Sequence, residues 1–143
     1  MSFLSRLFSP TAASARSASQ ARFTGTDQVR PADILSAIDN SLARIDFTPD
    51  GVIIAANDNF LQVFGYTLEE IRGKHHSIFV EAGHRESQEY SRFWQALRDG
   101  RSFTAAYERR GKDGRPVYIM GTYSPVRDAG GRVIRVVKFA IDN

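Results

Sequence analysis

Apolar residues along this chain recur at two spacings, and each spacing predicts one kind of element. Ile38 follows Leu35 by three positions and Ile34 by four, so the three side chains lie on one face of a helix. Thr67 and Glu70 form a capping box, because the threonine hydroxyl and the glutamate carboxylate each accept an otherwise unpaired amide hydrogen. Such signals predict helices over residues 31–42, between Asn57 and Gly65, between Thr67 and Gly73, and over 87–98.

A spacing of two predicts the strands. Phe103, Ala105 and Tyr107 alternate with the residues between them, as in a strand that has two different faces. Turn sequences rich in Gly, Pro and Asp separate the apolar runs, for example "PDG" at 49–51. The predicted strands cover residues 43–47, 52–56, 103–108, 116–126 and 133–141. This order of elements is typical of an α+β protein with an antiparallel sheet and helices on one face.

The composition narrows the class of protein. A chain of 143 residues with 42% hydrophobic content suits one globular domain with a real core. The sequence has no cysteine, which excludes disulfides, thiolate metal sites and cysteine nucleophiles. No apolar run approaches the roughly 20 residues that a membrane-spanning helix needs. Together these features predict a cytoplasmic protein.

The net charge of +3 is concentrated at the N-terminus, because residues 1–30 contain four arginines and a single acidic residue, Asp27. The rest of the chain is balanced, so no nucleic-acid partner is predicted. We predict that residues 1–30 form a mobile or disordered segment. Its Ser, Ala and Arg content also resembles a transit peptide, and residues 1–10 are the only candidate for membrane contact.

Four segments, taken in order, resemble a PAS domain over residues 31–143: "FTPDGVIIAANDNF", "GYTLEEIRGK", "FWQALRDGRSFTAAYERRGKDGRPVYI" and "YSPVRDAGGRVIRVVKFAID". Within that family, "GYTLEE", "KHHSIFV" and "FWQALRDG" are similar to the PAS domains at the N-terminus of bacterial chemotaxis and aerotaxis transducers of the methyl-accepting family. One segment differs: residues 80–83 are Val-Glu-Ala-Gly, where aerotaxis receptors carry a charged Arg-His-Pro-Asp stretch.

The resemblance implies a fold and a function. The fold is a five-stranded antiparallel sheet in the order 2-1-5-4-3, with short helices forming a pocket over one face and an additional N-terminal helix. The function is that of a sensory module that binds a redox cofactor, FAD, in this pocket and passes the change to an output domain of the same polypeptide. Two alternatives remain open, a haem-binding gas or redox sensor, and a cofactor-free dimerisation or interaction module.

Trp94 and His76 are the first candidate site residues. In flavin-binding aerotaxis receptors a tryptophan at the position of Trp94 lies against the flavin, and a large indole with one N–H donor suits such a contact. His76 matches a histidine of the same receptors and would hydrogen-bond a flavin, or serve as the axial ligand of a haem. Without the resemblance, Trp94 is expected to be an ordinary core residue.

Asn57, Phe60 and Phe79 complete the predicted site. Asn57 follows the second strand, where it either contacts a cofactor ring or caps the next helix. Phe60 and Phe79 are expected to line the pocket, or to fill it with Phe64 and Trp94 in the cofactor-free alternative.

Other polar residues are expected to be solvated. His75 and His76 should point in opposite directions, so they are not expected to share a metal, and a zinc site lacks a third ligand. His75 and His84 are predicted to lie in solvated loops. The basic run Arg109, Arg110 and Lys112 is expected at a solvated hairpin rim, with contact to a cofactor phosphate as the alternative.

Two predictions concern activity and assembly. No motif of an acyl or phosphoryl transferase is present, so we predict that the protein is not an enzyme. The apolar stripe on 31–42 predicts a homodimer built on this helix.

No signalling domain follows Asn143, so we expect the chain to be an N-terminal fragment of a larger transducer.

Overall fold

The computed structural model describes residues 28–142 of the chain. The predicted mobile segment 1–30 therefore lies almost entirely outside the described residues, and so does the candidate for membrane contact. The first described element is α3 (Pro31–Ser41), as the helical repeat predicted. The chain divides into two units between Ser36 and Ala37, inside this helix, and the second unit holds the sheet.

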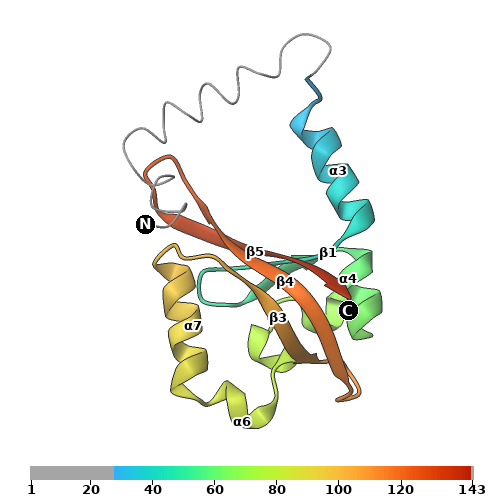
Figure 1. The fold of residues 1–143 in the computed structure, drawn as a ribbon, viewed down its shortest axis with the longest axis vertical. Helices are drawn as coiled ribbons and strands as arrows, with labels where there is room; N and C mark the ends of the chain where they lie inside the picture. Colours follow the sequence, from blue (N-terminus) through green and yellow to red (C-terminus); the bar gives the residue numbers. More distant parts are fainter. Residues whose placement is uncertain (1–27, 143) are drawn as a thin grey trace. The chain divides into compact units, whose positions relative to one another are not determined.

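The five strands form one antiparallel sheet in the order β2-β1-β5-β4-β3 (Figure 1). This order confirms the α+β fold that the resemblance implied. The strands are β1 (Ala43–Phe47), β2 (Ile53–Ala56), β3 (Phe103–Arg110), β4 (Pro116–Arg127) and β5 (Val133–Asp142). The last strand of the sequence is thus the central one, because β5 pairs with β1 on one side and with β4 on the other.

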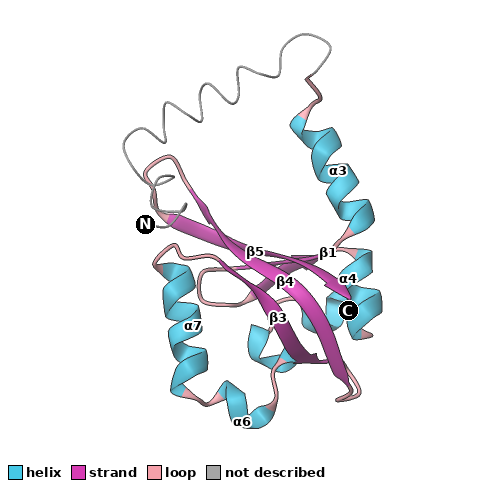
Figure 2. Ribbon diagram, viewed as in Figure 1, coloured by secondary structure: helices cyan, strands magenta, loops and turns pink. Residues whose placement is uncertain are grey.

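Short helices connect β2 to β3 and pack their apolar residues against one face of the sheet (Figure 2). They are α4 (Asp58–Phe64), α5 (Leu68–Ile71), the 3₁₀ helix η2 (His76–Phe79), α6 (Ala82–Arg85) and α7 (Gln88–Arg98). The caps explain their limits: the predicted capping box of Thr67 and Glu70 begins α5, and Gly65 ends α4 with a positive φ of 79°. None of the helices in the described range is long and apolar enough to cross a membrane.

Alternation along the strands defines the face that meets the helices, called here the inner face. On β4, Ile119 and Tyr123 are buried on this face, while Tyr118 and Met120, on either side of Ile119, are exposed. Lys138 of β5 lies opposite Tyr123 of β4 and Ile45 of β1, so this lysine also belongs to the inner face. The sheet therefore directs a charged residue toward the core.

Candidate functional site

His76 lies at the centre of the core and links three elements. Its ring is completely buried and makes two hydrogen bonds, from Nδ1 to the Tyr90 hydroxyl at 2.7 Å and from Nε2 to the Tyr123 hydroxyl at 2.8 Å. These bonds join η2 to α7 and to β4. The backbone fixes the histidine in this position, because its amide donates to the Gly51 carbonyl at 2.8 Å.

Arg109 determines how the protons are arranged in this chain of hydrogen bonds. Its Nε and Nη2 both donate to the Tyr123 hydroxyl, at 3.3 and 3.1 Å. A hydroxyl oxygen that accepts twice has one proton left to donate, and Nε2 of His76 is its remaining partner. His76 is therefore the Nδ1–H tautomer, which donates to Tyr90. We call His76, Tyr90, Tyr123 and Arg109 the His76 network.

The surroundings keep this network neutral except at Arg109. Burial lowers the pKa of His76 well below its ordinary 6.5, and the positive charges of Arg109 and Lys138 lower it further. Burial also raises the pKa of Tyr123 to about 12 and that of Tyr90 to about 12. At neutral pH the imidazole and both phenols are uncharged, so the network acts through hydrogen bonds rather than ion pairs.

Lys138 is a second buried cation beside the network. The lysine is 2% exposed, and its Nζ lies 4.7 Å from the centre of the Tyr123 ring and 5.8 Å from that of Tyr107. Among residues 28–142 no carboxylate forms a salt bridge with Lys138 or with Arg109. Burial lowers the pKa of Lys138 well below its usual 10.5, and Arg109 adds to this effect.

Trp94 of α7 lies directly against the network. Its ring centre is 5.3 Å from that of His76 and 5.9 Å from that of His75. The indole Nε1 is buried without a hydrogen bond of normal geometry. Beside it opens a cleft of about 310 Å³, which Asp50 and Tyr90 also line. The N–H nevertheless interacts with the Tyr90 hydroxyl, because burial raises the pKa of that phenol and the indole N–H lowers it by a smaller amount.

The structure brings four of the five predicted site residues into one aromatic core. Trp94 contacts His76, His76 lies 6.0 Å from Phe79, and Phe79 lies 5.3 Å from Phe60 between ring centres. Both phenylalanines are buried, at 1% and 2% exposure. Their edge-to-face packing fills the space between the sheet and the helices with side chains of the chain itself.

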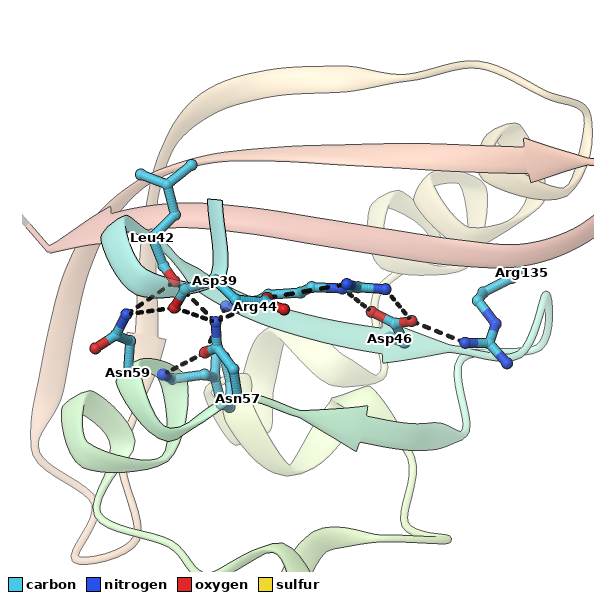
Figure 3. A network of polar contacts seen from close by, with 8 residues as sticks. Asp39, Leu42, Arg44, Asp46, Asn57, Asn59 and Arg135 are labelled. Carbon is cyan, nitrogen blue, oxygen red and sulfur yellow. Dashed lines mark hydrogen bonds and ion pairs between the residues drawn. The ribbon is translucent and has the colours of Figure 1, made fainter. Parts of the chain in front are cut away.

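Asn57 lies apart from this core, at the end of β2 (Figure 3). Its Oδ1 accepts from the backbone amides of Phe60 and Arg44, and its Nδ2 donates to the Leu42 carbonyl at 2.9 Å. The side chain thus caps α4 and ties it to the start of β1. This geometry supports the capping interpretation and leaves the amide engaged with the backbone rather than turned toward His76.

A buried negative charge, Asp46 of β1, lies on the opposite side of the sheet, called here the outer face (Figure 3). The carboxylate is 2% exposed and accepts from Nε of Arg44 at 2.9 Å and from Nη1 of Arg135 at 2.9 Å. The hydrogen bond to Asp46 raises the pKa of Arg44. We call Asp46, Arg44 and Arg135 the Asp46 cluster.

The prediction for His75 needs correction, because this residue is not a solvated loop residue. Its Nδ1 accepts from the Ser77 amide at 3.0 Å, which caps η2, and its Nε2 lies 3.0 Å from the Asp50 carbonyl. Gly51, with a φ of 89°, allows this approach: a Cβ there would lie 2.7 Å from Nε2 of His75. The two histidines do diverge as predicted, since only His76 enters the core.

Two further predictions, a solvated loop for His84 and a solvated hairpin rim for Arg109, were wrong. His84 lies in α6, a helix too short to give a periodic pattern. Arg109 turns inward from β3 and is 7% exposed, whereas Arg110 is partly exposed and Lys112 pairs with Glu70 at the surface. Sequence reasoning also missed Tyr123 and Lys138. The alternation along β5 could have indicated the burial of Lys138, because this residue occupies an inner-face position between Val136 and Ala140.

Comparison with known proteins identifies this architecture. A family model described as the PAS fold matches residues 53–140. The chain belongs to the PAS family. This PAS domain is 44% identical over 108 residues to the biofilm dispersion protein BdlA of Pseudomonas aeruginosa, covering 76% of this chain and 26% of the relative. It is 30% identical over 111 residues to phototropin-2 of Oryza sativa subsp. japonica, covering 77% of this chain and 12% of that protein.

Solved structures agree on the PAS fold. An RNA-binding light-oxygen-voltage receptor matches with a TM-score of 0.68 at 22% identity, over 83% of this chain and 35% of that one. A light-oxygen-voltage domain studied with a flavin analogue matches with a TM-score of 0.65 at 20% identity, over 78% and 84% of the two chains. The curated relatives are much longer than the matched region, which covers about a quarter of the first and less of the second.

The packed core between the sheet and the helices has no room for a flavin or a haem among its contacting rings. The ring system of a flavin needs a cavity of a few hundred Å³ at least. The space between sheet and helices holds the contacting rings of His76, Trp94 and Phe79 instead. Both ring nitrogens of His76 are hydrogen-bonded, so neither is free to ligate iron. The Trp94 cleft is open at the surface, whereas the indole Nε1 itself is buried.

Proposed function

We propose that this PAS domain is the cytoplasmic sensory module of a larger signalling protein of the chemotaxis or aerotaxis type. The observation that carries the proposal is the His76 network. Two hydrogen bonds from one buried ring join η2, α7 and β4, so a change at His76 alters how the helices are held against the sheet. BdlA, whose name assigns it to biofilm dispersion, supports the place of this domain in a larger protein, because the matched region is only 26% of its length.

The physical requirement for such a module is a ligand or state that favours one arrangement of the helices over another. The hydrogen-bonding state of a buried imidazole meets this requirement, because its hydrogen bonds are strong in a low-dielectric core and costly to leave unmade. Displacing the Tyr90 hydroxyl from Nδ1 would release α7, while β4 would stay fixed by its two neighbouring strands.

The test is the output of the polypeptide that carries this domain, measured with His76→Gln and with the matched control His84→Gln. Loss of the stimulus response only in the His76 variant is expected, with both variants folded by circular dichroism. An unchanged response in His76→Gln would refute the role of this network.

FAD is the second candidate for the input. The 310 Å³ cleft that Trp94 lines favours it, together with a structural neighbour whose name includes a flavin analogue. Because the chain has no cysteine, a bound flavin could form no adduct with a protein thiol. A visible absorption spectrum of the purified protein tests this candidate. A flavin band that weakens in Trp94→Ala supports FAD, and a colourless protein under flavin-supplemented expression argues against it.

Assembly as a homodimer is part of the same proposal. No residue of α3 is buried, and Ile34 and Leu35 are 50% and 42% exposed. A second copy that packs on this stripe would remove the exposed apolar area from water. Each isoleucine or leucine buried there contributes roughly 1.5–3 kcal/mol.

Light scattering on the parent and on Ile34→Asp with Ile38→Asp tests the dimer. The parent is expected to have twice the mass of the double variant, because a charge on the stripe opposes its burial. A parent that remains monomeric at micromolar concentration would rule out assembly through residues 31–42.

A further inference from the structure

The inner face of the sheet carries two buried cations and no buried carboxylate. Lys138 and Arg109 are 2% and 7% exposed, and the only carboxylate buried to this degree among the described residues is Asp46. Asp46 lies on the other face of the sheet and is already bonded to Arg44 and Arg135. The positive charge of the inner face is therefore unbalanced within residues 28–142.

Such an arrangement is costly in a folded protein. An isolated ammonium group taken from water loses several kcal/mol of hydration unless a charge or hydrogen bonds replace it, and this loss is why burial lowers the pKa of Lys138 well below its usual value. The aromatic rings under Nζ of Lys138 recover only part of this, about 0.5–2 kcal/mol for a cation over an aromatic face. No hydrogen bond from Nζ to another described residue is found, so the ammonium retains donors for a further partner.

Arg109 also retains donor capacity. Its Nε and Nη2 donate to Tyr123, and its Nη1 donates to the Glu108 carbonyl at 3.2 Å. A guanidinium has five N–H groups, so these three bonds leave two unused. Both cations lie near the half-buried ring of Tyr107, whose centre is 4.6 Å from Cζ of Arg109 and 5.8 Å from Nζ of Lys138. The two charges thus share one aromatic neighbour.

Small residues give solvent a route to this place. Ala105 of β3 pairs with Gly121 of β4, on the inner face next to Tyr107 and Tyr123. Ala105 is exposed although it shares this face with buried neighbours, so water reaches the inner side of the edge strand. A Cβ on Gly121 would lie 3.3 Å from Cε of Lys138. The glycine therefore leaves room for the lysine chain to lie across the strand.

We propose that a compact anion, with a carboxylate or a phosphate group, binds at the inner face of the sheet between Lys138 and Arg109. This proposal rests on the sensory role proposed above and names the chemical class of the input. The anion would neutralise both cations, and its contact with Arg109 would change the donors available to Tyr123. The change would reach His76 through the Tyr123 hydroxyl, which connects the anion site to α7.

The experiment measures the melting temperature of the parent in sodium acetate, sodium succinate and sodium phosphate, each against sodium chloride at equal ionic strength. A ligand that binds only the folded state raises the melting temperature with increasing concentration. We expect a rise of several degrees with at least one of these anions. A response to acetate or succinate assigns a carboxylate ligand, and a response confined to phosphate assigns a phosphorylated one.

Lys138→Met and Lys74→Met are the matched variants, because both remove one positive charge but Lys74 is exposed. Lys74→Met should keep the full response. Lys138→Met should lose it and should melt higher than the parent in chloride alone, since an unneutralised buried charge is gone. If Lys138→Met does not fold, Lys138→Gln takes its place.

The proposal is overturned if none of the three anions raises the melting temperature of the parent above the chloride control. It is also overturned if the lysine variant responds as strongly as the parent, because the anion then binds elsewhere. Neither result would affect the sensory role itself, which depends on the separate response of His76→Gln.

Discussion

The two faces of the sheet treat buried charge in opposite ways. Asp46 pairs with Val137 across β1 and β5, and the adjacent Ile45 pairs with Lys138. The buried acid and the buried lysine are thus one step apart in the same strand pair, but they point to opposite faces. On the outer face two arginines neutralise Asp46, whereas on the inner face Lys138 and Arg109 have no counter-ion among the described residues.

This difference separates a structural cluster from a responsive one. The buried carboxylate of the Asp46 cluster is completely paired, because its oxygens accept from both arginines. The inner face is incomplete, because the spare donors of Lys138 and Arg109 have no counter-ion among the described residues. A complete cluster holds one conformation, while an incomplete one changes when a partner arrives.

The largest expected effect comes from opening the complete cluster. Asp46→Ala leaves Arg44 and Arg135 without their shared partner and should lower the free energy of unfolding by about 2–3 kcal/mol. This lies below the roughly 3–5 kcal/mol for breaking a fully buried pair, because the side chain of Arg135 is 42% exposed. Urea denaturation measures the loss. Asp33→Ala, in an exposed pair, should cost less than about 1 kcal/mol, and equal losses would contradict the comparison.

Removing a single hydroxyl from the inner face should come next. Tyr123→Phe deprives Nε2 of His76 and two N–H groups of Arg109 of their partner, at a cost of about 1–3 kcal/mol in unfolding free energy. The exposed Tyr118→Phe is the control and should leave the urea midpoint unchanged. A parent-like midpoint for Tyr123→Phe would mean that the network is not a source of stability.

The neutral state of His76 predicts a pH dependence. Its pKa is lowered in the folded state, so below pH 6.5 the unfolded chain binds a proton that the folded protein excludes. Stability should therefore fall as the pH falls below 6.5, with a slope of up to about 1.4 kcal/mol per pH unit. Urea denaturation at several values between about pH 5 and pH 7, the range in which an ordinary histidine titrates, measures this slope. His76→Gln should flatten the slope and His84→Gln should retain it; an unchanged slope in His76→Gln would assign the effect to other groups.

The smallest effect concerns a cap at the edge of the inner face. His75→Ala removes the acceptor of the Ser77 amide and should cost about 0.5–1 kcal/mol. Glu81 is the matched control, because it precedes α6 without a capping hydrogen bond. Glu81→Ala should therefore show no loss in the same thermal melt. A larger loss at Glu81 than at His75 would invalidate the assignment of the cap.

Local patterns were sufficient to predict the elements with strong repeats or caps. The stripe of Ile34 and Ile38 predicted α3, and the capping box of Thr67 predicted α5. Periodicity could not predict η2 or α6, because four residues make only one turn. Val52 was assigned to a strand, yet it forms an isolated bridge with His75 and β2 begins at Ile53. The strand order came from family resemblance, since pairing partners far apart in sequence leave no local pattern.

The candidate site was only partly predictable. Resemblance selected His76 and Trp94, which do lie in contact in the core. Their partners Tyr90 and Tyr123 are 14 and 47 positions from His76, so only the folded chain reveals them. Arg109 was misjudged because a run of basic residues suggests a solvated rim, although alternate residues of a strand face opposite sides. Whether FAD binds stays a prediction.

Gly121 and Lys138 form a pair whose sizes must change together. A Cβ at position 121 would lie 3.3 Å from Cε of Lys138, so the lysine chain would have to shift by a few tenths of an ångström to admit even an alanine. Homologous sequences that keep the long cation at 138 should therefore retain glycine at 121, and those with a bulkier residue at 121 should carry a shorter one at 138. Covariation of these two columns would then divide related domains into those that keep the inner-face cation and those that have lost it.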